Sequence, residues 1–264
     1  MNSFKINFQL QELENVCLWG EKNKSIHWFG LTDGFLWINV GSETIYEYNQ
    51  YAREYFKSDI KYNDYHIVRF IEDFSDTFRY IGESVPKKLY DNIDVFQIQT
   101  NKWKESYIDE PDDVFDRFYF DKYCNLTEWY TDRSFDSIHL IGGPYITFIR
   151  CEDKIKILWK SEFLLENGNS IWTSPKGIFE MQYKDFVSEV KSFFESFFTA
   201  MDKQVANAVI KDWGDVSLDK EYLVQEHSKR KSEIYQKISF LENSIDNTDW
   251  NKIIQIYNEM QREI

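Results

Sequence analysis

Cysteine is scarce in this chain and follows no regular spacing. The three cysteines, Cys17, Cys124 and Cys151, lie far apart, and none belongs to a C-x-x-C pair. Disulfide frameworks and zinc knuckles need several cysteines at short, repeated spacings, so the sequence indicates neither. An odd number of cysteines is typical of a reducing compartment.

Long apolar runs and a secretory leader are also missing. A membrane-spanning helix needs ~20 consecutive apolar residues, and no stretch of the sequence approaches that length. Polar and apolar residues alternate from Met1 to Phe8, whereas a signal peptide begins with a basic segment followed by an apolar one. We therefore expect a cytoplasmic protein with no membrane partner.

Proline and glycine are rare, while apolar residues are abundant. The 264 residues include four prolines and ten glycines, and 42% of them are hydrophobic, a composition typical of a folded chain. A chain of this length can bury roughly 75% of the surface that its unfolded form exposes. The sequence thus supports a large core without disulfide bonds.

Basic residues are outnumbered, most strongly in one segment. The chain has 31 Lys and Arg against 45 Asp and Glu, a net charge of −14, and half of this excess lies between Glu105 and Asp136, where ten acidic residues accompany three basic ones. A negative field repels phosphate backbones and attracts basic surfaces. The segment therefore predicts a basic protein partner and no nucleic acid; the alternative is an acidic loop that serves only solubility.

Alternating apolar residues predict two groups of antiparallel strands. In the first group, Phe4 to Leu10 forms a strand, and turns at Asp33-Gly34 and at Asn39 to Ser42 connect three more, because Asp-Gly pairs favour tight hairpins. These three strands are 26 to 32, 35 to 40 and 43 to 48. Both faces of the predicted hairpin are apolar, so helices of the chain or a partner cover them.

The second group of strands and most of the helices follow later in the chain. The expected strands are 138 to 141, 145 to 151 and 155 to 159, with further segments at 171 to 173 and 178 to 181. Apolar spacings of three and four predict helices over 64 to 80, 184 to 210, 218 to 243 and 248 to 262. Residues 87 to 128 are the least regular, and we expect loops there with one or two short helices.

Together these elements predict an α+β fold in which antiparallel β meanders pack against amphipathic helices. We expect an α+β domain over residues 1–212 and a C-terminal helical hairpin over 213–264, because a short polar link joins its two helices. The hairpin either docks on the domain or forms a homodimer.

Common catalytic and cofactor motifs are absent from the sequence. None of G-x-x-x-x-G-K-[ST], G-x-G-x-x-G, H-E-x-x-H and G-x-S-x-G occurs, which removes the commoner nucleotide-binding, metalloprotease and hydrolase classes. Asp112, Asp113 and Asp116 lack the glycine and the distal glutamate of a calcium-binding EF-hand loop. We therefore predict no cofactor and no metal.

The segment from Trp129 to Asp136 combines aromatic and charged residues. In a helix, Trp129 and Arg133 share one face, and Arg133 can pair with Asp136. Arginine stacks on tryptophan and binds carboxylates with two parallel hydrogen bonds. These residues therefore form either a structural clamp between a helix and a sheet or part of a binding site.

The chain resembles an uncharacterised family of bacterial cytoplasmic proteins. The resemblance covers residues 4 to 206 and leaves 213–264 outside. It rests on Trp19-Gly20, W-F-G-L-T-D-G from Trp28 to Gly34, Val68 to Asp73, Trp129 to Asp136 and Trp172-Thr173, with W-F-G-L-T-D-G the most specific. That family has no established activity, so the resemblance implies no catalytic residues. By analogy, it implies an immunity protein that neutralises a bacterial toxin.

Our leading hypothesis is therefore a non-enzymatic, acidic protein-binding module. The candidate partner-binding residues are Asp109, Glu110, Asp112, Asp113, Asp116, Trp129, Asp132, Arg133 and Asp136. A second hypothesis is a small-molecule or peptide sensor. Its pocket is expected to be lined by Trp28, Trp37 and Trp129, with Asp33 and Arg133 as polar contacts. An enzyme of unrecognised type is the third.

Overall fold

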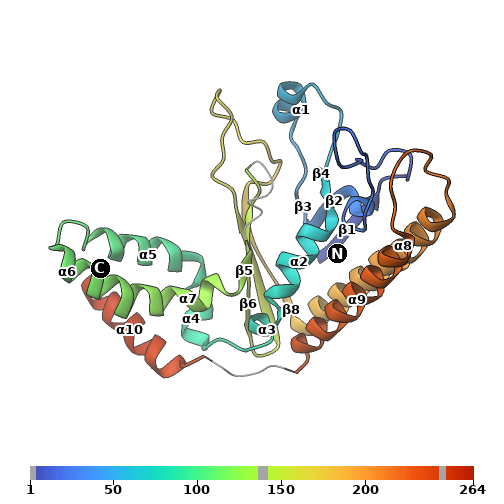
Figure 1. Cartoon of the computed structure of the whole chain (residues 1–264). Helices are drawn as coiled ribbons and strands as arrows, with labels where there is room; N and C mark the ends of the chain where they lie inside the picture. Colours follow the sequence, from blue (N-terminus) through green and yellow to red (C-terminus); the bar gives the residue numbers. More distant parts are fainter. Residues whose placement is uncertain (1–3, 136–141, 244–247) are drawn as a thin grey trace.

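The computed structural model describes residues 4–135, 142–243 and 248–264. Within them the chain forms two antiparallel four-stranded sheets with helices packed on them. This arrangement confirms the predicted α+β class (Figure 1). The predicted strand 138 to 141 and the candidate residue Asp136 lie outside the described residues.

The first sheet is built around β2. Its strands are β1 (Phe4–Leu10), β2 (Asp33–Val40), β3 (Glu43–Ile45) and β4 (Asn63–His66). β1 pairs with Gly34 to Val40 of β2, while β3 and β4 share the other edge of β2. The turn predicted at Asn39 to Ser42 joins β2 to β3, and Gly41 adopts a positive φ of 63° in it. α1 (Gln50–Phe56) follows β3.

The hairpin predicted at Asp33-Gly34 is wrong. Residues 26 to 32 form no strand; Gly30–Thr32 is a 3₁₀ turn, and Asp33 and Gly34 are the first residues of β2. A Cβ atom at Gly34 would lie 2.3 Å from the Gln9 carbonyl oxygen of β1. Glycine is therefore present because the two strands approach closely and not because the chain turns.

The second sheet stands in the middle of the molecule (Figure 1). Its strands, in spatial order, are β5 (Ser134–Phe135), β6 (Tyr145–Cys151), β7 (Lys154–Lys160) and β8 (Lys176–Gln182). β6, β7 and β8 confirm three of the predicted strands. The segment 171 to 173 is not a strand, because Trp172 forms only an isolated bridge with Tyr48.

Each face of the second sheet belongs to a different hydrophobic core. Phe148 and Ile157 face the first core, which the first sheet shares with α2 (Ile67–Asp76), α3 (Phe78–Ile81), α8 (Tyr183–Ile210) and α9 (Lys220–Ile238). Ile149 and Cys151 face the second core. The helices of that core form the helical lobe: α4 (Lys87–Asp91), α5 (Ile93–Glu105), α6 (Asp112–Phe118), the π-helix η2 (Tyr119–Cys124), α7 (Asn125–Thr131) and α10 (Trp250–Glu263).

The helical lobe corrects the prediction of loops over 87 to 128, because almost all of that segment is helical. Its helices are short, so each shows only a brief periodic pattern. In α5 the buried residues Ile93, Phe96, Thr100 and Trp103 do follow the helical spacing, but the polar Thr100 interrupts the apolar stripe. By contrast, the 28-residue α8 confirms the helix predicted over 184 to 210.

The two C-terminal helices are present, but they bury their apolar residues in different cores. Ile234 and Ile238 of α9 belong to the first core, whereas Ile253 and Tyr257 of α10 belong to the second. The two helices of the predicted C-terminal hairpin therefore pack in different cores. A sequence pattern identifies an amphipathic helix but not the surface that covers its apolar face.

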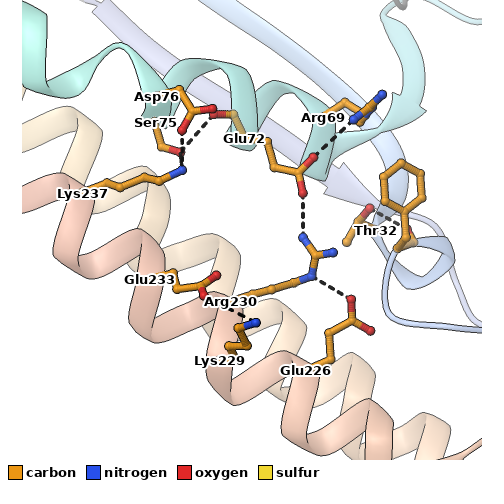
Figure 2. A network of polar contacts seen from close by, with 11 residues as sticks. Thr32, Arg69, Glu72, Ser75, Asp76, Glu226, Lys229, Arg230, Glu233 and Lys237 are labelled. Carbon is orange, nitrogen blue, oxygen red and sulfur yellow. Dashed lines mark hydrogen bonds and ion pairs between the residues drawn. The ribbon is translucent and has the colours of Figure 1, made fainter.

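Polar contacts hold α9 against α2 (Figure 2). Arg230 of α9 binds Glu72 of α2 through Nη1 at 2.6 Å and Glu226 of α9 through Nε at 2.8 Å. His227 lies one turn before Arg230 on α9 and is buried. Its Nδ1 accepts a hydrogen bond of 3.0 Å from Trp28 Nε1. The tryptophan of the W-F-G-L-T-D-G segment therefore anchors α9 and belongs to the core.

We predict that Gly34→Ala destabilises the fold by about 2 kcal/mol or more, because backbone atoms of β1 must move to make room for the new methyl group. Gly30→Ala in the same segment is the matched control. Its Cβ would lie 3.5 Å from its nearest neighbours, so the stability should change by less than about 1 kcal/mol. Urea unfolding of both variants measures the difference in stability. Equal unfolding midpoints would contradict a close approach of β1 and β2 at Gly34.

Candidate functional site

The candidate residues from the sequence fall into three separate places. Asp109, Glu110, Asp112, Asp113 and Asp116 are exposed at the end of the helical lobe. Trp129 and Arg133 are buried, with exposed fractions of 2% and 0%. Asp132 is half-buried in a groove. The sequence segment 105 to 136 is therefore not one surface.

The exposed acids lie where α5 ends and α6 begins, at the far left of Figure 1. We call this surface the acidic tip; its members are Ile108, Asp109, Glu110, Asp112, Asp113, Asp116, Phe120 and Asp121. Pro111 caps α6, which places Asp112 and Asp113 in the first helical turn. Carboxylates are favourable there because the helix dipole is positive at its N-terminus.

Two of the three basic residues in the 105 to 136 segment bind carboxylates outside the acidic tip. Lys122 pairs with Glu259 of α10, and Arg133 pairs with the buried Glu83. Only Arg117 remains, with its Nη2 3.7 Å from an Asp113 oxygen and both side chains highly exposed. An exposed pair of this kind contributes little. The field of the remaining carboxylates is thus poorly compensated.

Two large apolar side chains accompany these carboxylates. Ile108 is 61% exposed and Phe120, on η2, is 63% exposed. Single exposed apolar residues are common on protein surfaces, but here they lie within a charged surface. An exposed aromatic ring among carboxylates is a suitable anchor for a partner with basic and apolar residues.

Trp129 and Arg133 form the structural clamp and not a binding surface. Arg133 Nη2 donates to Glu83 Oε2 at 2.7 Å, and its Nη1 donates to the Trp129 carbonyl oxygen at 2.8 Å. The guanidinium also lies 5.2 Å from the centre of the Trp250 ring. On the other side of Glu83, the Thr248 hydroxyl and backbone N–H donate to the same carboxylate. Both side chains are buried in this structure, so neither is exposed for the contact with a partner that the sequence suggested.

Glu83 is the member of this clamp that sequence reasoning missed. It lies 50 residues before Arg133, in a short segment between α3 and α4, and nothing in its neighbours marks it as buried. Its exposed fraction is 2%. Only the fold brings the two charges together.

Asp132 lines a groove of about 460 Å³ between α2, α3 and the start of the second sheet. Asp73, Asp76 and Tyr80 line the same groove. Burial, and then the charge of Glu128, raise the pKa of the Asp132 carboxyl above its usual range. Arg69 also lines this groove, and Lys237 pairs with Asp76, so Asp132 lies in a mixed-charge groove separate from the tip.

The residues of the predicted sensor pocket do not come together. Trp28 is buried in the first core beside His227, and Trp129 lies in the second core. Trp37 stacks on Tyr62 with ring centres 4.2 Å apart. The tryptophans serve three separate packing sites.

Among the residues that the structure describes, no group of three or more His, Cys, Asp or Glu is placed to hold a metal ion. None of the described helices is long and apolar enough to cross a bilayer.

Comparison with known families places the chain. A model of a family of unknown function, DUF5984, matches residues 5–256. The chain belongs to this family. The match includes α9 and part of α10. No curated protein and no solved structure matches the chain.

We predict that Arg133→Met destabilises the protein by about 3–5 kcal/mol, because it leaves the Glu83 carboxylate buried without its partner. The double variant Glu83→Gln/Arg133→Met removes both charges and should recover much of the loss. Arg117→Met is the matched control, since Arg117 is exposed, and it should unfold like the wild type. Chemical unfolding curves measure all three; an unaffected Arg133→Met would show that the clamp has no structural role.

Proposed function

We propose that this chain is a non-enzymatic protein-binding module that uses the acidic tip to bind a basic protein. The observation that carries the proposal is the concentration of exposed carboxylates at the end of the helical lobe. Lys122 and Arg133, two of the three bases in the same segment, bind carboxylates outside this surface. Opposite charges on two proteins speed their encounter and discriminate against other partners.

The tip offers two kinds of interaction. Its carboxylates act at long range and give association that weakens as salt is added. Ile108 and Phe120 contribute only when the partner is in contact, because burying their exposed apolar surface stabilises the complex. A basic protein with an apolar patch beside its positive charges fits both.

A more specific form of this proposal is an immunity protein that neutralises a bacterial toxin in the cytoplasm. Toxins that act on nucleic acids present basic surfaces, and a rigid acidic surface can cover them. This step rests on analogy, because the family has no assigned function.

We predict that neutralising the tip slows partner binding. The variant carries Asp109→Asn, Asp112→Asn, Asp113→Asn and Asp116→Asn. It should reduce the association rate constant about tenfold or more at low salt, and the difference should shrink at high salt. Biosensor kinetics with a basic protein captured from the native host provide the measurement.

A matched control changes the same number of exposed carboxylates elsewhere. Its substitutions are Glu166→Gln, Asp185→Asn, Glu195→Gln and Asp215→Asn, all at exposed positions. The control should bind like the wild type. Equal slowing in both variants would indicate a general charge effect, and no slowing in either would exclude the tip as the binding surface.

The immunity role has a separate test. Cells that express the gene product encoded next to this chain are grown with the wild-type chain, the tip variant or the control variant. The wild type and the control should restore growth, while the tip variant should not. If the wild type binds a basic protein but protects against no toxin, the binding proposal stands and the immunity role is excluded.

A further inference from the structure

A separate cleft of about 600 Å³ lies between the helical lobe and one end of the second sheet. α5, η2 and α7 form one wall, and the start of β6 and the end of β7 form the other. A cleft of this size fits a small ligand. The π-helix η2 supplies Tyr119 and Tyr123 to the wall, and π-helical segments are frequent at functional sites.

Hydroxyl groups in this cleft have already used their hydrogens on the protein. Thr100, Thr127 and Thr131 donate to backbone oxygens one turn earlier in their helices, and Ser161 donates to the Gly142 carbonyl oxygen. A hydroxyl has one hydrogen to donate and two lone pairs that accept. The three threonine oxygens are therefore left as hydrogen-bond acceptors for a ligand, and Ser161 Oγ, which already accepts from the Phe163 N–H, keeps one lone pair.

Two carboxamides on α5 complete the polar lining. Gln97 and Asn101 lie one turn apart and both line the cleft. In the part of the chain that the structure describes, neither side chain has a hydrogen-bond partner, whereas Gln99 on the same helix binds Gln261. A carboxamide both donates and accepts. The two free amides can therefore bind groups that do the same.

Aromatic rings supply the apolar surface. The Tyr119 and Tyr123 rings lie nearly parallel, 5.5 Å apart, and Phe96 and Tyr130 form a second near-parallel pair at the same distance. All four residues line the cleft. Burial raises the pKa of Tyr130 to about 12, so its hydroxyl stays neutral. Phe96 and Tyr130 are buried, so Tyr119 and Tyr123 are the pair that can meet a ligand; the faces of such rings attract its partly positive C–H groups.

The charges of the lining cancel. Lys160 and Glu162 are its only ionised side chains among the described residues, and they pair with each other at 2.5 Å in exposed positions. An anionic ligand would offer only acceptors to the threonine and serine oxygens, and Lys160, the one cation among the described lining residues, is already paired with Glu162. A ligand that suits this cleft is neutral and rich in donors.

We propose that this cleft binds a neutral saccharide of one or two rings. A sugar hydroxyl donates to the threonine and serine oxygens and exchanges hydrogen bonds with Gln97 and Asn101. The C–H face of a sugar ring packs on the tyrosine rings. This site is independent of the acidic tip, so either proposal can fail without the other.

The first experiment tests ligand class. Saturation-transfer difference NMR on the full chain uses glucose, galactose, N-acetylglucosamine and their disaccharides as probes. Glucose 6-phosphate, glucuronate and uridine are the comparators. At least one neutral saccharide should give a signal that the charged sugars do not. No saccharide signal, or stronger binding of a charged sugar or of uridine, would overturn the proposal.

The second experiment places the bound saccharide. Gln97→Leu/Asn101→Leu should weaken the binding at least tenfold by titration, because the leucines cannot exchange hydrogen bonds. Gln99→Leu is the matched control, since Gln99 is on α5 but outside the cleft lining, and it should bind like the wild type. Thermal melts establish that both variants fold. If the double variant does not fold, the single variant Asn101→Ala, at an exposed position, takes its place. Unchanged affinity in a folded cleft variant would exclude this site.

Discussion

The buried ion pair between Glu83 and Arg133 is the interaction on which the arrangement of the molecule depends. Taking two charges out of water is costly, and only excellent geometry with further hydrogen bonds offsets this cost. Here the Trp129 carbonyl oxygen and the Thr248 hydroxyl and N–H supply those bonds. The pair thereby joins three segments: the end of α3 in the first core, the end of α7, and the residues that lead into α10.

This clamp also shapes the outer surface of the helical lobe. α10 begins just after Thr248, which binds Glu83, and Glu259 of the same helix binds Lys122. The clamp uses Arg133 directly and holds the helix that uses Lys122. Two of the three bases in the acidic segment are thus paired with carboxylates outside the tip.

The helical lobe presents two surfaces of different chemistry. Its acidic tip has charge and exposed apolar side chains, which suit a protein. Its cleft has no net charge, and it offers acceptors, carboxamides and aromatic faces, which suit a small neutral molecule. α5 contributes to both, since its C-terminal end leads into the tip while Phe96, Gln97, Thr100 and Asn101 line the cleft. The two sites therefore share a rigid element without sharing residues.

Local pattern alone determined the fold class, the strands β1, β6 and β7, the long helix α8, and the acidic character of 105 to 136. Each of these depends on neighbours in the sequence, because side-chain periodicity and charge density are properties of short segments. Only the tertiary structure decided why Gly34 is glycine, which core each C-terminal helix joins, and which members of the acidic segment are exposed. Those outcomes depend on partners distant in sequence, such as Gln9 for Gly34 and Glu83 for Arg133. A segment does not encode the surface that the rest of the chain brings against it.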